Sequence, residues 1–455
     1  MRTSLFFAAL STVSALAFAG CLGDPLDGPS TPSPPSLELT ELMTFSNHVV
    51  EPAVHFALGL YEPTIDVSDS GVIYISAHSI GLDSTGAPAF FSKDDGKAWA
   101  QLPFAASAAL PEPMHGGTPP PSDEIFIVAG DEGQAWSVDI TLGTFPVNGW
   151  CGDGAEHCYH NPNAYNRAEA DPDCATAALN DRPWAAYASG TLLMVNNPGG
   201  GPVQVGAMKV PRPTYAEAAN PVQGPTWNLC AGSGGSIPGI PDMREDLFFA
   251  VPQEQSGKFV VVTGYATNVK DVQERAVFEN SHVYASSNGN FGQAVFDGEG
   301  TLFVAAMNNQ AAAAGEDAGG IHIAASLDDG ETFVERTFRF AQPVSSVYAD
   351  GNKHGPGVLI NWGQVDGDAT DWYMGHLFAG ADGAPEIREI TLAVDNGPEA
   401  SRHVQGAAVG PDGRGYMVMS EVSGNDQGQS LTQTGSKPLT VVVQETGPTL
   451  PVEST

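Results

Sequence analysis

Charged side chains that could bind or convert a ligand recur at the starts of similar segments of the sequence. A guanidinium group holds an anionic ligand through paired hydrogen bonds, and two carboxylates can serve as acid and base at a glycosidic bond. One interpretation is a mixed-charge pocket for a polar ligand. The other, which we favour, is that each arginine pairs with a carboxylate of a neighbouring element, because buried charges need partners whatever the function. The residues concerned are Glu62, Asp181, Arg182, Arg244, Asp246 and Arg402.

The segments that must position these side chains have the pattern of β-hairpins. Apolar residues alternate with other residues on both sides of a short turn rich in Asp, Asn and Gly, which is the signature of two antiparallel strands. The clearest examples are residues 64–75, 185–195, 294–304 and 407–418.

A second recurring unit has the form S-x-D-D-G-x-x-aromatic. In such a turn the Asp side chain accepts backbone N–H bonds, the Gly adopts a positive φ, and the aromatic ring packs beneath. A weaker copy lies at residues 286–291. The two full copies consist of Ser92, Asp94, Gly96 and Trp99, and of Ser326, Asp328, Gly330 and Phe333.

One hairpin and one such turn together make four strands over about 40–50 residues, the size of one β-propeller blade. The sequence here resembles the BNR/Asp-box repeat proteins, the superfamily that includes the sialidases, over residues 60–445. The resemblance implies an all-β propeller with six or seven blades around a central channel, and gives the Asp-box residues a structural role. A pair of β-sandwiches is the alternative fold. We count seven blade starts, near Glu62, Asp123, Asp181, Asp242, Gly292, Val344 and Arg402.

The same resemblance indicates which residues the chain would need for exo-α-sialidase activity. A sialidase holds the substrate carboxylate with an arginine cluster, whose first member stands in Arg-Ile-Pro at the first blade, and uses a Tyr–Glu pair and an Asp in catalysis. Here the matching stretch is Tyr61–Ile65, and Glu62 occupies the arginine position. We therefore predict a non-catalytic binding module for a glycan or a protein. A glycan-active hydrolase with a divergent channel site is the alternative.

Residues 361–373 combine aromatic and acidic side chains. A glycan could stack on Trp362 or Trp372, although these rings could equally anchor a blade hairpin, which we favour. Oxygen-rich sequences also suit Ca²⁺, so Asp366, Asp368 and Asp371 are candidate ligands of a calcium ion.

The composition limits the classes of partner. The 455 residues carry 18 Lys+Arg against 53 Asp+Glu, a formal net charge of −35, and include 53 Gly and 35 Pro. Binding to nucleic acid or to anionic lipid requires basic residues, so neither is expected. The composition fits an acidic, turn-rich β protein, and we expect a monomer.

The first residues have the features of an export signal. An apolar run from Leu5 to Phe18 ends in small residues before Cys21, and this end resembles a bacterial lipobox, in which the cysteine is lipidated. Cleavage after Ala19 is the alternative. We predict a signal peptide over residues 1–21, a Pro-rich tether over 22–37 and one domain over 38–455. Leu22 after the cysteine suggests the outer membrane.

Four further cysteines remain. An even number in an exported chain predicts two disulfides, with three possible connectivities. Three of the four fall in one segment, which we expect to be an insertion in the second blade. A zinc site that includes His157 and His160 is the alternative, although an oxidising compartment favours disulfides. The cysteines are Cys151, Cys158, Cys174 and Cys230.

Overall fold

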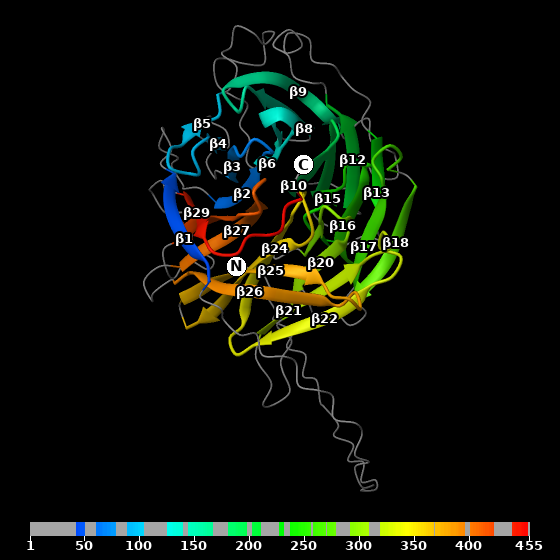
Figure 1. Ribbon diagram of the computed structural model, residues 1–455. Helices are drawn as coiled ribbons and strands as arrows, with labels where there is room; N and C mark the ends of the chain where they lie inside the picture. The colour runs from blue at the N-terminus through cyan, green and yellow to red at the C-terminus, as the bar shows by residue number, and fades with distance from the viewer. Residues whose placement is uncertain are drawn as a thin grey trace, which may run out of the picture. The chain divides into compact units, whose positions relative to one another are not determined.

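The chain folds into seven antiparallel sheets that follow one another along the sequence (Figure 1). This computed structural model describes the residues between 42 and 453 that are given at the end of this paragraph. Among them no helix has the length and apolar character that a membrane crossing requires. Residues 1–41, with the expected signal peptide and most of the tether, lie outside this part, so those two assignments stay predictions. The described ranges are 42–50, 61–78, 89–103, 125–139, 144–166, 181–197, 203–210, 227–231, 237–255, 258–269, 271–278, 292–308, 319–367, 369–395, 401–422 and 439–453.

Each sheet is one blade, and in the first six blades the strands run outward from the centre in chain order. Blade 1 consists of β2 (Tyr61–Val67), β3 (Ile73–His78), β4 (Ala89–Ser92) and β5 (Ala100–Gln101). Blade 2 consists of β6 (Ile125–Ala129), the short 3₁₀ turn η1 (Asp131–Gly133), β7 (Ala135–Asp139), β8 (Thr144–Cys151) and β9 (Glu156–Asn166). Blade 3 consists of β10 (Asp181–Ala188), β11 (Thr191–Asn197), β12 (Val203–Lys209) and β13 (Trp227–Ala231).

The remaining blades follow the same plan, except that two short strands share the inner position of blade 4. Blade 4 consists of β14 (Ile237–Pro238), β15 (Asp242–Met243), β16 (Phe248–Gln255), β17 (Lys258–Tyr265) and β18 (Val272–Phe278). Blade 5 consists of β19 (Gln293–Phe296), β20 (Leu302–Met307), β21 (Gly319–Ser326) and β22 (Val334–Phe340). Blade 6 consists of β23 (Val344–Gly351), β24 (Val358–Asp366), β25 (Ala369–Ala379) and β26 (Pro385–Val394).

Blade 7 closes the ring because it takes its strands from both ends of the chain. Its inner strands are β27 (Ser401–Val409), β28 (Gly415–Val422) and β29 (Leu439–Thr446), and the outer strand is β1 (Thr44–Val50). β1 pairs antiparallel with β29 from Thr44 opposite Thr446 to Val50 opposite Leu439. Figure 1 shows β1 in blue beside β29 in red. The fold is a β-propeller of seven four-stranded blades.

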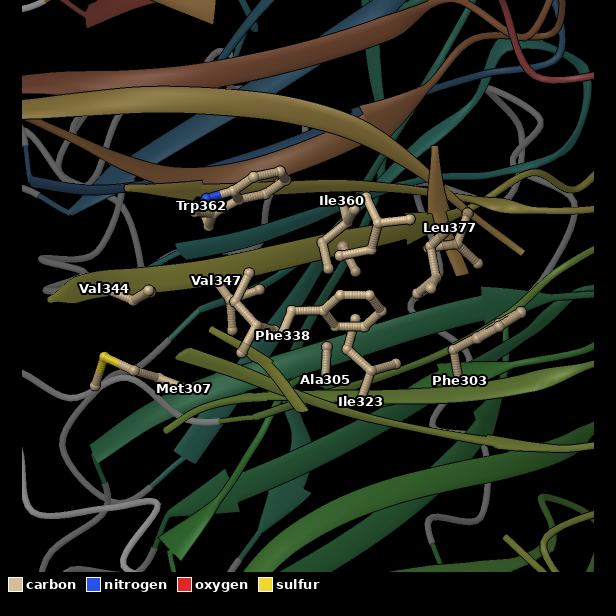
Figure 2. Close-up of a cluster of buried hydrophobic side chains, with 14 of the residues drawn as sticks. Phe303, Ala305, Met307, Ile323, Phe338, Val344, Val347, Ile360, Trp362 and Leu377 are labelled. Carbon is tan, nitrogen blue, oxygen red and sulfur yellow. The ribbon is translucent and has the colours of Figure 1, made fainter. Parts of the chain in front are cut away.

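The hydrophobic core is divided among the blade interfaces. The buried apolar side chains of the described residues form seven clusters, and each cluster joins two adjacent blades, including blade 7 to blade 1. Figure 2 shows the cluster between blades 5 and 6, where Phe303 and Ile323 face Val347 and Ile360. Trp362 belongs to this cluster and is fully buried. The alternating apolar residues of the hairpins therefore pack blade against blade.

All seven predicted blade starts fall within two residues of the first residue of an inner strand. The cysteine-bearing segment belongs to blade 2, but the prediction of an insertion is wrong for its described part, because Thr144–Cys151 and Glu156–Asn166 pair as the two outer strands that complete the blade. Cys151 ends β8 and Cys158 lies in β9, and both are in the reduced form in this structure.

The two S-x-D-D-G turns have the predicted geometry. In blade 1 the Ser92 hydroxyl donates to Asp94 Oδ1 (2.9 Å) and accepts from the Gly96 N–H (3.0 Å). Gly96 has a φ of 79°, where an L-residue is strained. The same two bonds recur in blade 5, where Ser326 donates to Asp328 and the N–H of Gly330 donates to Ser326 (2.8 Å each). Trp99 and Phe333 pack against the clusters beside their turns. The weaker copy at 286–291 lies outside the described residues.

We predict that Ser92→Ala and Ser326→Ala each lower the free energy of unfolding by about 1–2 kcal/mol, because each removes two hydrogen bonds around a buried hydroxyl. The two costs should agree, since the contacts are the same. Urea unfolding measures them. Glu331→Ala, at an exposed position of the second turn, is the matched control and should change the value by less than about 0.5 kcal/mol. A serine variant as stable as this control would contradict the assigned role.

Candidate functional site

A cavity of about 80 Å³ lies where the inner strands meet. Charged and polar side chains enter it from β2, β15 and β19 and from β23 with the turn that follows, while β6, β10 and β27 supply mostly apolar walls. The lining residues are 64–66, 126–128, 185–187, 240–242, 293, 295, 349, 350, 353, 406 and 407. Every blade therefore contributes to this cavity, which is the candidate functional site at the centre of the propeller.

Three carboxylates in the cavity, those of Asp66, Asp242 and Asp350, bind the backbone of the next blade. Each accepts a hydrogen bond from an N–H group on the neighbouring inner strand. The donors are Ala129 to Asp66 (2.8 Å), Phe296 to Asp242 (2.8 Å) and Val409 to Asp350 (2.7 Å). These bonds tie blade 1 to blade 2, blade 4 to blade 5 and blade 6 to blade 7. We call the three carboxylates the channel latches.

Two channel latches are also bound on their second oxygen. Asp66 Oδ1 accepts from the Val67 N–H at 2.8 Å, and Asp242 Oδ1 accepts from the Met243 N–H at 2.7 Å. A carboxylate held in this way has little freedom to act as a base or to grip a ligand.

Lys353 places the one described cationic side chain of the cavity among these acids. It lies in the turn after β23, and its side chain is exposed to the solvent inside the ring. The charge of Asp66, followed by that of Asp350, raises the pKa of Lys353, so the amine stays protonated. Burial and then the charge of Asp66 raise the pKa of Asp350. Burial raises the pKa of Asp242 to about 6. The cavity thus holds one ammonium among three carboxyl groups, two of which keep their protons to a higher pH than an ordinary Asp.

The chemistry of this centre is cohesion between blades. No arginine is among the described residues that line it, so these residues offer no arginine cluster for an anionic sugar. Sequence reasoning missed the channel latches because each is a single Asp near the end of an apolar strand. A weak signal was available in the hairpin register. Asp66 and Asp242 each stand one residue before the end of their strand, and each lies opposite the residue eight positions later, Tyr74 and Ala250.

Four predicted site residues lie at one end of the inner strands. Glu62 is the second residue of β2, Asp181 and Arg182 begin β10, and Arg402 is the second residue of β27. They precede the cavity-lining residues of the same strands, so the fold gathers these positions at one end of the ring. Their side chains lie outside the described part, and their function stays a prediction.

Arg244 and Asp246 lie at the opposite end, in the turn between β15 and β16. Arg244 donates to Asp246 Oδ2 (2.8 Å) and to Asp329 Oδ1 (2.5 Å) in the S-x-D-D-G turn of blade 5. Arg414 makes the same kind of bond, at 2.9 Å, to Asp95 in the first such turn. Arg244 therefore joins blades 4 and 5, as the paired-charge interpretation expects, and does not share a pocket with the positions at the strand starts.

The aromatic segment of blade 6 is part of the core. Trp362 and Trp372 are fully buried, and Trp362 stacks on Tyr373 with ring centroids 5.7 Å apart. These tryptophan rings anchor the hairpin and present no face to a glycan. Of the calcium candidates, Asp366 and Asp371 lie on this hairpin and Asp368 lies outside the described residues.

Within the described ranges no three His, Cys, Asp or Glu side chains are arranged to hold a metal ion. This covers Cys151, His157 and Cys158, whereas Cys174 and the side chains of His160 and Cys230 lie outside those ranges. The two-disulfide assignment stays a prediction.

Comparison with known proteins finds similarity in structure only. No protein-family model matches the sequence, and no curated protein is similar to it in sequence. The NanB sialidase of Streptococcus pneumoniae is 11% identical over 87% of this chain and 70% of its own, with a TM-score of 0.45. An α-L-arabinanase of Penicillium chrysogenum is 12% identical over 88% of this chain and 98% of its own (TM-score 0.40). A PL25 ulvan lyase is 9% identical over 85% and 94% (TM-score 0.48).

We predict that Asp242→Asn changes the pH dependence of stability. The pKa of Asp242 is about 6 in the folded protein and about 3.9 in an unfolded chain. The folded state therefore binds more protons between these values, and this stability is present below pH 4 and lost as the pH rises through 6. From pH 4 to pH 7 the wild type should lose roughly 2 kcal/mol relative to the variant. Urea unfolding at both pH values measures this, and parallel pH profiles would contradict it.

Proposed function

We propose that this protein is a lipid-anchored binding propeller of the bacterial cell envelope that holds a glycan or protein ligand without converting it. The proposal rests on how the carboxylates at the centre of the ring are bound and on how small the cavity there is. Its described carboxylates are bound to the backbone of neighbouring blades, and the cavity measures about 80 Å³. Small-molecule sites in enzymes commonly measure about 300–1,000 Å³. The centre thus supports a structural role, and we therefore place the ligand on one of the two faces of the ring.

The face with the turn after β23 is covered by the protein itself. Asn352 donates to the Pro451 carbonyl (2.6 Å), and the Glu453 N–H donates to the His354 carbonyl (2.8 Å). His354 in turn approaches Asp69 of blade 1, with Nε2 and Oδ1 3.2 Å apart. Figure 1 shows the C-terminal segment, in red, running from β29 toward the centre of the ring. We therefore assign the ligand to the opposite face.

The opposite face is the one where the inner strands begin, with Glu62, Asp181, Arg182 and Arg402. Arginine and carboxylate side chains together suit a polar ligand with both acceptor and donor groups, such as a glycan or a mixed-charge protein surface. The competing function, glycan hydrolysis, would use the same positions, with the carboxylates as acid and base. Turnover separates the two functions.

We expect the purified protein to bind members of a glycan array, or a protein ligand, and to hydrolyse none of a panel of glycosidase substrates. Arg182→Ala should weaken binding about tenfold or more, the cost of one charge-assisted contact, and leave the melting temperature unchanged. Lys209→Ala, an exposed cation of the same blade, is the control and should bind normally. Turnover that is lost in a folded Glu62→Gln variant would replace this proposal with the hydrolase.

The proposed lipid anchor at Cys21 can be tested separately from ligand binding. Cells expressing the full chain and fed an alkyne fatty acid should incorporate the label at Cys21, and Cys21→Ser should abolish it, because the acyl chains attach at that position. Cys174→Ser is the control and should keep the label. A labelled Cys21→Ser variant, or an unlabelled wild type cleaved after Ala19, would contradict lipidation.

A further inference from the structure

The turn between β8 and β9, residues 152–155, packs against blade 1, and we call it the wedge. Gly152, Asp153 and Gly154 have φ values of 60°, 54° and 81°, which fold the turn tightly. A Cβ at Gly154 would lie 3.0–3.1 Å from side chains of blade 1, those of Leu102, Phe91 and Tyr74. The backbone of the turn thus approaches blade 1 so closely that a side chain at Gly154 would fit only if these neighbours shifted, and the positive φ of this residue also favours glycine.

Lys93 holds the same turn from the S-x-D-D-G unit of blade 1. Its ammonium donates to the Gly152 carbonyl at 3.3 Å and lies 3.6 Å from Asp153 Oδ2. These groups are exposed, and contacts of this kind contribute little to stability. The position of the wedge therefore depends mainly on the pairing of β8 and β9, the two strands that carry it.

Two cysteines flank the wedge. Cys151 pairs with Glu156 at the start of the turn, while Cys158 is the extra residue of a β-bulge, since Trp150 pairs with His157 and Gly149 with Tyr159. Cys158 is fully buried, and its Sγ lies 3.6 Å from the Gly149 carbonyl oxygen. Because Cys151 lies opposite Glu156, Cys158, two residues further along β9, is its diagonal neighbour across the hairpin. Burial and then a hydrogen bond to Cys151 raise the pKa of Cys158.

We infer that Cys151 and Cys158 form a disulfide that closes the β8–β9 turn and fixes the wedge between blades 1 and 2. The structure thereby selects one of the three possible connectivities and leaves Cys174 and Cys230 outside this bond. The inference concerns assembly of the ring and does not depend on which ligand the propeller binds.

The bond forms by exchange with a disulfide oxidant, such as oxidised glutathione or a protein disulfide. Cys151, the more accessible thiol, loses its proton and attacks the oxidant, which releases one thiolate and leaves a mixed disulfide. Cys158 then loses its proton and attacks the Cys151 sulfur, which releases the second thiolate. The two released thiolates take up the two protons that the cysteines lose, so two electrons reduce the oxidant to two thiols.

The sequence makes the connectivity directly measurable. Trypsin does not cut after Arg182, because Pro183 follows, so the cysteines fall into three peptides: 98–167 with Cys151 and Cys158, 168–209 with Cys174, and 210–244 with Cys230. The purified full chain is reduced, reoxidised with oxidised glutathione and mapped by mass spectrometry. We expect peptide 98–167 to be two hydrogens lighter and joined to no other peptide. A cross-link from 98–167 to either other peptide, or two free thiols in it, would overturn the inference.

Stability provides the second readout. The double variant with Cys151→Ser and Cys158→Ser should melt about 4 °C below the oxidised wild type, as expected for the loss of one disulfide. The matched double variant with Cys174→Ser and Cys230→Ser keeps the bond inside peptide 98–167. Reductant should therefore lower the melting temperature of the matched variant. A matched variant whose melting temperature does not respond to reductant would overturn the inference.

Discussion

Closure of the ring by β1 is the interaction on which the rest of the structure depends. Each blade buries its apolar side chains only against its two neighbours, so a ring opened at one interface exposes two hydrophobic faces. The pairing of β1 with β29 prevents this, because it makes blade 7 a product of both ends of the chain. The segment after β29 extends the same closure, since Leu450 is buried between blades 6 and 7.

The charges at the centre follow from this closure. Seven inner strands converge on the axis, and each presents the N–H groups of a free sheet edge there. Asp66, Asp242 and Asp350 bind such groups on the next blade, so an acid at the axis satisfies an edge and joins two blades at once. Three acids in one cavity repel one another, and Lys353 offsets part of that repulsion. A centre built in this way is acidic for structural reasons.

The sequence predicted the parts of this fold that are local. Strand alternation and the S-x-D-D-G turns are properties of short segments, so the blade starts and the Ser92 and Ser326 turns could be read from it. The channel latches could not, because each joins strands of different blades. Arg244 was grouped with Arg182 since both follow a blade start. The inner strand β15 has only two residues, however, and this brings Arg244 to the far end of the ring.

The two ends of the inner strands therefore differ in function. At one end the channel latches, the Arg244 and Arg414 bonds and the C-terminal segment hold the blades together, and the polar groups there are already engaged. Substitution at that end costs stability before it can alter recognition. At the other end the strands begin with Glu62, Asp181 and Arg182, where we propose that the ligand binds. On that proposal specificity can change without loss of the ring, because the described bonds between blades lie at the opposite end of the inner strands.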